Sequence, residues 1–122
     1  MSNLKEKLFK KIEEHRPRTI RLLKEHGDKV AGEVTISQII GGMRGIKSLV
    51  TDISYLDPNE GIRFRGHTLL DTIDLLPKVP GGEMPYVEGL VYLLLTGEIP
   101  TDDEIKAVAE EFNKRKNVPK YV

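Results

Sequence analysis

Residues 86–97 have the sequence YVEGLVYLLLTG, and they decide the fold more than any other stretch. From Leu90 to Leu95 every residue is apolar, and Gly97 then provides a typical end for a helix. Because successive side chains point to all sides of a helix, a helix of this composition has to be buried on all sides. The other predicted elements are short and amphipathic, so we expect part of its packing surface to come from residues or subunits outside this chain.

Four amphipathic segments flank this stretch in the sequence. A helix is predicted over residues 3–26, where Pro17 should kink or break it because proline lacks an amide hydrogen and crowds the preceding turn. The other three helices start with capping-box patterns, in which a threonine and a polar residue three positions later cover free amides. These patterns begin at Thr35, Thr68 and Thr101.

A β-hairpin is predicted near residues 50–65. Apolar residues lead into the turn sequence DPNEG at residues 57–61, and IRFR at residues 62–65 alternates apolar and basic side chains. No other stretch predicts a strand convincingly. The chain is therefore expected to be mainly α, with several short helices and one small hairpin.

Composition and charge narrow the functional classes. The 122 residues fit one domain, and a formal net charge of zero gives no field that favours nucleic acid. No apolar run approaches the roughly 18 residues of a membrane span. The absence of cysteine excludes disulfides, thiolate metal sites and a cysteine nucleophile. The first 15 residues lack a signal-peptide core and are rich in glutamate, unlike a transit peptide, so a cytoplasmic location is expected.

The charges are unevenly distributed along the chain. Residues 1–30 contain nine Lys or Arg against five Asp or Glu, whereas residues 51–100 contain three against eight. The basic front and the acidic middle could attract each other or partner subunits. The more common meaning of such a pattern is a solvated helix face.

The sequence offers little catalytic chemistry. His15 and His26 fall in a charged helical stretch, where exposed side chains are the rule, and His67 lies beside the Thr68 cap, where a turn or capping role is favoured. No His, Asp or Glu cluster has metal-ligand spacing, and no serine or threonine has the glycine-flanked setting of a nucleophile. We therefore assign no catalytic residue and no metal ligand.

Residues 41–47, with the sequence GGMRGIK, are the best candidate for an anion site. Glycines let backbone amides approach an anion, and the guanidinium of Arg44 offers a fork of donors that matches phosphate. A surface arginine after a glycine-terminated helix would look the same. Arg63 and Arg65 form a second basic pair, predicted to lie on one face of the hairpin. They could bind an anion, but pairing with Asp57, Glu60 or an acidic partner is favoured.

Four linked sequence blocks resemble the front of citrate synthases. They are GGMRG at residues 41–45, LDPNEGIRFRG at 56–66, GGEMP followed by EGL at 81–90, and LTGEIPT at 95–101. Their order and spacing are similar to those of the animal-mitochondrial type. The resemblance covers almost the whole chain and is far more specific than any single short motif.

The resemblance implies a nearly all-helical, homodimeric enzyme that condenses acetyl-CoA with oxaloacetate to give citrate and CoA. In that family an aspartate and two histidines move protons and polarise the substrates, while arginines hold the dicarboxylate. All of these match positions beyond Val122, so residues 1–122 are expected to be an inactive amino-terminal segment, with the rest of the enzyme absent. Arg44 corresponds to an arginine that contacts the phosphates of CoA. The resemblance implies acetyl-CoA as a substrate of the parent enzyme and no separate cofactor.

Two alternatives stay open at this level. A 2-methylcitrate synthase, which uses propionyl-CoA, would have the same blocks, because the acyl pocket is formed further along the enzyme. A non-catalytic helical module that associates through Leu90–Leu95 would also explain the apolar helix. In either case a homo-oligomer is expected, since exposed apolar surface favours association.

Overall fold

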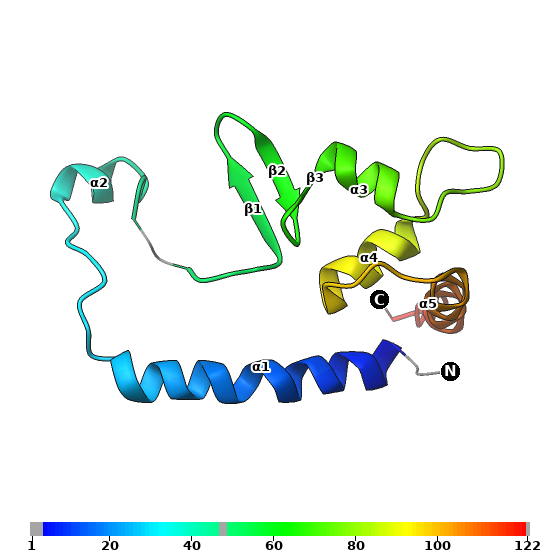
Figure 1. The fold of residues 1–122 in the computed structure, drawn as a ribbon, viewed down its shortest axis with the longest axis horizontal. Coiled ribbons are helices and arrows are strands. Elements are labelled where there is room, and N and C mark those ends of the chain that lie inside the picture. The colour runs from blue at the N-terminus through cyan, green and yellow to red at the C-terminus, as the bar shows by residue number, and fades with distance from the viewer. Residues whose placement is uncertain (1–3, 47–48, 122) are drawn as a thin grey trace. The chain divides into compact units, whose positions relative to one another are not determined.

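The structure, a computed structural model, describes residues 4–46 and 49–121 and within them contains five helices and three strands (Figure 1). The prediction of a mainly α chain is confirmed. The chain divides into two compact units, one of residues 1–12 with 52–122 and the other of residues 13–51. In the described part of the chain, no helix is both long and apolar enough to cross a membrane.

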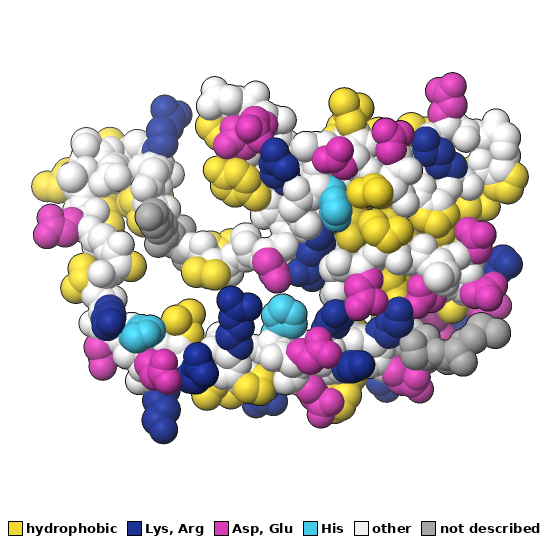
Figure 2. Space-filling view, viewed as in Figure 1, with side chains coloured by type: hydrophobic (Ala, Val, Ile, Leu, Met, Phe, Trp, Pro, Cys, Tyr) yellow, Lys and Arg dark blue, Asp and Glu magenta, His cyan; other side chains and the backbone are white. Residues whose placement is uncertain are grey.

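Helix α1 spans Leu4–His26 and belongs to the first unit up to Ile12. Of the kink or break expected at Pro17, the break is wrong, because the helix continues through this residue. All residues from 13 to 20 are exposed, so the carbonyl that loses its amide partner at Pro17 can bond to water. The helix ends as predicted at Gly27, whose amide donates to the carbonyl of Leu23 at 2.8 Å. Figure 2 shows charged side chains of both signs along this helix.

The predicted hairpin is confirmed and carries one further strand. Strands β1 (Ser54–Asp57) and β2 (Gly61–Phe64) pair antiparallel, and β3 (His67–Thr68) adds to β2 in the order β1-β2-β3. Between β2 and β3 the two-residue turn has positive φ at both positions, 50° at Arg65 and 88° at Gly66. Such turns match the twist of antiparallel strands. The sequence did not predict β3, since two residues cannot show an alternating pattern.

The remaining helices begin and end close to the predicted positions. Helix α2 (Ile36–Ile40), α3 (Leu69–Leu75) and α5 (Asp102–Arg115) each follow a capping box formed by a threonine side chain and the residue three positions later. Helix α4 (Val87–Thr96) ends at Gly97, which has the left-handed φ of 76° that favours glycine. The three predicted capping boxes are therefore all confirmed.

The core of the first unit lies where α4 packs against α5 and the end of α3. Helix α4 contributes one buried stripe at helical spacing, Gly89, Tyr92, Leu93 and Thr96. The other apolar residues buried with this stripe in the described chain are Leu76, Pro100, Ile105 and Val108.

The opposite side of α4 is partly open. Val87 is 70% exposed and Leu95 is 41% exposed. Within residues 4–46 and 49–121, therefore, α4 is fully buried along one stripe and only partly covered elsewhere, where Val91 and Leu94 are half-buried. The apolar face predicted for α3 behaves similarly, because Leu69 and Leu70 are exposed while Leu76 is buried.

Gly89 provides a test of how closely α4 approaches its neighbours. A Cβ atom at this position would lie 3.6 Å from Ile105 Cδ1, 3.7 Å from Pro100 Cγ and 3.8 Å from Leu76 Cδ2, which are ordinary contacts. Gly89→Ala should therefore stabilise the chain by roughly 0.5–1 kcal/mol through the helix propensity of alanine. Gly89→Leu should destabilise it by about 1–3 kcal/mol, because three further carbons have no room.

Urea unfolding followed by far-ultraviolet circular dichroism compares the two variants with the parent chain. A leucine variant as stable as the alanine variant would contradict the close packing.

Candidate functional site

The glycine-rich loop at residues 41–46 follows directly from the end of α2. The amide of Gly41 donates to the carbonyl of Ser37 at 2.8 Å, and the amide of Met43 donates to the carbonyl of Gln38 at 2.7 Å. These bonds cover the last carbonyls of the helix and fold the chain back across its end. Gln38 also caps the start of α2, so one residue supports both ends of this short element.

The loop then has positive φ at three of its residues, 77° at Gly42, 62° at Met43 and 76° at Gly45. The amides of Gly42, Met43 and Ile46 donate to backbone carbonyls of the loop and of α2, so they stabilise the turn and are not available to an anion. Methionine rarely adopts this conformation, so the turn at Met43 is imposed by its surroundings and not by its own preference.

Arg44 lies at the exposed tip of this loop. Its carbonyl accepts a hydrogen bond from Gln38 Nε2 at 3.4 Å. Within residues 4–46 and 49–121 its guanidinium forms no ion pair and no side-chain hydrogen bond, so its donors face solvent. Lys47, the other basic residue predicted for this loop, lies outside the described residues. The loop therefore presents one arginine that is available to an anion from outside.

Arg63 and Arg65, the second pair of basic residues, contact different parts of the structure. Arg63 lies on β2, and its Nη2 atom binds Glu60 Oε2 at 2.6 Å while Nη1 donates to the carbonyl of Gly66 at 3.1 Å. The preferred structural role is thus confirmed for Arg63. Arg65 lies in the following turn, so the prediction that both side chains share one face of the hairpin is wrong.

Arg65 instead joins the hairpin to the end of α4. Its Nε and Nη2 atoms donate to the carbonyl of Leu94 at 3.0 and 2.7 Å, and Nη2 also reaches the carbonyl of Leu95 at 3.3 Å. Its Nη1 atom pairs with Asp52 at 2.9 Å, and only 16% of the side chain is exposed. A cation at the carbonyl end of a helix is favoured by the helix dipole. Sequence analysis missed this role, although an arginine before a glycine in a tight turn was a usable signal.

The three histidines lie on two elements, α1 and β3. His15 and His26 are exposed on α1, as predicted. His67 lies on β3 next to the Thr68 cap, and its charge contributes to lowering the pKa of the nearby Asp71, after the larger effects of hydrogen bonds from Thr68. Among the described residues, no group of three or more His, Asp or Glu side chains could hold a metal ion.

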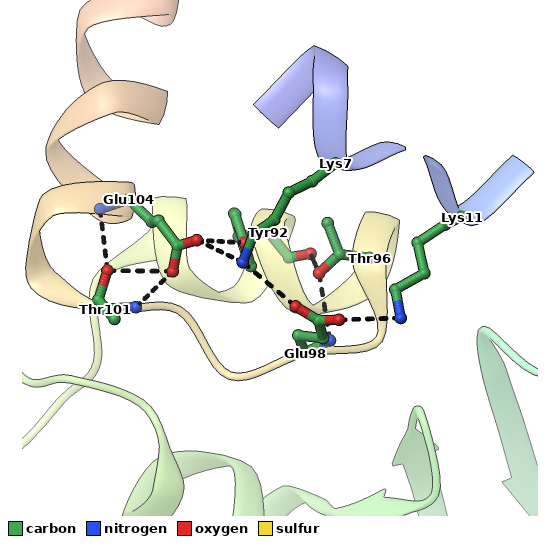
Figure 3. A network of polar contacts seen from close by, with 7 residues as sticks. All are labelled: Lys7, Lys11, Tyr92, Thr96, Glu98, Thr101 and Glu104. Atoms are coloured by element: carbon green, nitrogen blue, oxygen red, sulfur yellow. Dashed lines mark hydrogen bonds and ion pairs between the residues drawn. The ribbon is translucent and has the colours of Figure 1, made fainter. Parts of the chain in front are cut away.

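A polar network that sequence analysis did not assign joins the start of α1 to α4 and α5 (Figure 3). Lys7 Nζ lies 2.6 Å from Glu104 Oε1 and 3.2 Å from Glu98 Oε2, and it stands 5.5 Å from the centre of the Tyr92 ring. Tyr92 donates to Glu104 at 2.7 Å, and Lys11 binds Glu98 at 2.8 Å. The basic front of the sequence is thus paired with acidic residues near position 100.

The network keeps three of its members, Lys7, Glu98 and Glu104, in their charged states. Partial burial raises the pKa of Glu104, but hydrogen bonds from Lys7, Thr101 and Tyr92 outweigh that effect and lower the pKa to about 2. The bond to Glu104 raises the pKa of Lys7 above its usual range, and Lys11 with Lys7 lowers the pKa of Glu98. Because none of these groups titrates near neutral pH, the network is suited to holding elements together and not to transferring protons.

Comparison with known proteins identifies the family. A family model described as citrate synthase, C-terminal domain, matches residues 42–122. The chain is 48% identical over 120 residues to a protein named citrate synthase, mitochondrial, from Aspergillus niger, covering 98% of this chain and 25% of that protein. It is 50% identical over 119 residues to a 2-methylcitrate synthase, mitochondrial, from Yarrowia lipolytica, covering 98% and 26%. It is 43% identical over 121 residues to the citrate synthase, mitochondrial, of Xiphias gladius, covering 99% and 26%.

The chain belongs to the citrate synthase family. This confirms the resemblance carried by the four sequence blocks. The chain spans about a quarter of the length of the curated relatives it matches. Its assignment to the amino-terminal part of a longer protein stays a prediction.

The predicted cytoplasmic location is wrong. The relatives from Aspergillus niger, Neurospora crassa and Xiphias gladius are all named as mitochondrial proteins. The expectation rested on the composition of residues 1–15, and that composition has no bearing on the location if a targeting segment lies outside this sequence.

The pKa of Glu104 gives a testable acid response. A carboxyl whose pKa falls from its ordinary 4.5 to about 2 on folding stabilises the folded state above pH 4.5, and this contribution is lost as the pH falls from 4.5 to 2. A carboxyl-detected NMR titration should place the Glu104 midpoint near pH 2. In Lys7→Gln the midpoint should rise toward 4.5, because the strongest partner is gone.

The matched control is Lys10→Gln, which removes the same charge from an exposed position of α1. A midpoint for Glu104 that is unchanged by Lys7→Gln, or shifted equally by Lys10→Gln, would contradict the network.

Proposed function

We propose that this chain is part of an enzyme that condenses acetyl-CoA with oxaloacetate to give citrate and CoA, and that Arg44 contacts the phosphates of CoA. The family supports the reaction. The observation that carries the site is the exposed, unpaired guanidinium of Arg44 at the tip of a loop with three left-handed residues. Because guanidinium binds phosphate through two parallel hydrogen bonds, this geometry fits a phosphate better than a neutral ligand.

The chemistry itself is assigned to polypeptide outside these 122 residues. Carbon–carbon bond formation at an acetyl methyl group needs a base and an electrophile held close together. Among the described residues the lysines and glutamates of the Lys7 network are already paired with one another, and His67, on β3, is placed beside a helix cap. The chain by itself is therefore inactive in this proposal, and it supplies scaffold and one phosphate contact.

Two extensions follow from the relatives and the fold. The enzyme is mitochondrial, which is supported by the names of the relatives. It is also a homo-oligomer, which is supported by the partly exposed apolar side of α4. A propionyl-CoA-using 2-methylcitrate synthase is the second candidate function, because a relative of that name is 50% identical to this chain. The third alternative, a non-catalytic helical module that associates through its apolar helix, would explain α4 but would give Arg44 no role.

A thiol-release assay tests the proposal. The enzyme that contains these residues should release CoA from acetyl-CoA in the presence of oxaloacetate, and the 122-residue chain alone should not. Arg44→Ala in the enzyme should raise the KM for acetyl-CoA by roughly tenfold to a hundredfold, the loss expected for hydrogen bonds to a charged group. The kcat should change little, since Arg44 does not touch the reacting atoms.

Arg18→Ala is the matched control, because Arg18 is an exposed arginine of α1. Measurable turnover by the chain alone would contradict the assignment of catalysis to other polypeptide. An unchanged KM in Arg44→Ala would contradict the phosphate contact. Preference for propionyl-CoA over acetyl-CoA would favour the 2-methylcitrate alternative.

A further inference from the structure

The first turns of α1 are attached to the rest of their unit by one half-buried stripe. At helical spacing, Leu4, Lys7, Leu8 and Lys11 are partly covered, while the positions between them are exposed. Helix α1 has no fully buried residue in the part that the structure describes. Its attachment therefore lacks the apolar core contact that normally fixes a helix to a domain.

Charge supplies most of the specific contacts instead. Lys7 is bonded to two carboxylates at once, Glu104 at 2.6 Å and Glu98 at 3.2 Å. Lys11 adds a second bond to Glu98, at 2.8 Å. These partners are more than eighty positions away in the sequence, so the ion pairs close a long loop and are not local helix pairs.

The glutamates that bind the two lysines are themselves hydrogen-bonded to α4 and to the turn before α5. Glu104 is fixed by the Thr101 capping box, with the amide and hydroxyl of Thr101 donating to Glu104 Oε2 at 2.9 and 3.0 Å. Its other oxygen receives the Tyr92 hydroxyl at 2.7 Å. The amide of Glu98 donates to the hydroxyl of Thr96 at 3.1 Å. The Glu104 carboxylate is thus held in place by α4 and α5, and the backbone at Glu98 is held by α4 (Figure 3).

We propose that residues 4–12 form a strap that docks on the α4–α5 junction through the Lys7 and Lys11 ion pairs and is released when salt screens those pairs. The proposal goes beyond the proposed function and does not depend on it. The proposal gives a role to the polar network around Lys7. Neither the phosphate contact proposed for Arg44 nor the proposed reaction involves this network.

Salt can release residues 4–12 because the contacts that would remain without the ion pairs are weak. The side chains of Lys7 and Lys11 are both 30% exposed, so dissolved ions reach them. The screening length falls from about 10 Å at 0.1 M salt to about 3 Å at 1 M, which is close to the bond distances. Leu4 and Leu8 are only partly covered, so little apolar contact holds these first turns of α1 to the unit once the ion pairs are lost.

Hydrogen exchange measured by mass spectrometry tests the strap on the intact chain. In low NaCl the amides of residues 5–12 should exchange several-fold more slowly than in 1 M NaCl, while the amides of α4 should not change. The double variant Lys7→Gln, Lys11→Gln should exchange fast at both salt concentrations. Lys10→Gln, with a lysine removed from the exposed side of the same turns, should behave like the parent.

Exchange at residues 5–12 that does not depend on salt would overturn the proposal. So would a Lys10→Gln variant that matches the double variant, since net charge and not the specific pairs would then be responsible. Faster exchange of α4 together with residues 5–12 would also overturn it, because salt would be unfolding the unit and not releasing a strap.

Discussion

The packing of one face of α4 against α5 and Leu76 is the constraint on which the first unit depends. Tyr92, Leu93 and Val108 are almost completely buried there. The other parts of this unit attach to α4 or to the turn that follows it. The hairpin does so through Arg65, which binds the carbonyls of Leu94 and Leu95. The start of α1 does so through Lys7, which binds the carboxylates beside Tyr92.

The rest of α4 explains why this unit suits a larger assembly. Its uncovered side chains, such as Val87 and Leu95, are as apolar as its buried ones. A stable monomer of this length would normally place polar residues there. The family relationship and the quarter-length coverage agree with a helix whose second face packs on parts of a longer protein. Arg44, in the other unit, adds a solvent-facing cation for which the described chain provides no partner.

Local sequence patterns predicted most of the helices and strands. They did not predict the contacts of side chains whose partners are distant in the sequence. The capping boxes at Thr35, Thr68 and Thr101 were predictable because each involves residues three positions apart. The loop at Arg44 was predictable for the same reason. Arg65 and Lys7 were not, because their partners lie 29 and 91 positions away.

Local reasoning also went wrong over a possible break at Pro17 and overlooked one short strand. Pro17 did not break α1, because its whole surrounding turn is exposed and water can replace the lost hydrogen bond. Strand β3 was missed because it has only two residues. The uneven distribution of charge along the chain indicated that ion pairs between the basic front and the acidic residues were possible. It did not distinguish such pairs from a solvated helix face.

The central claim is that α4 is held by one face only, and a pair of equivalent truncations tests it most directly. Leu93 is 0% exposed and Leu95 is 41% exposed on the same helix, and both are leucines. In urea unfolding, Leu93→Ala should lower the free energy of unfolding by about 2–5 kcal/mol, as deletion of a buried leucine does. Leu95→Ala should change it by less than about 1 kcal/mol, since its environment is partly solvent already. Equal losses in the two variants would show that α4 is buried on both faces, and would contradict the account.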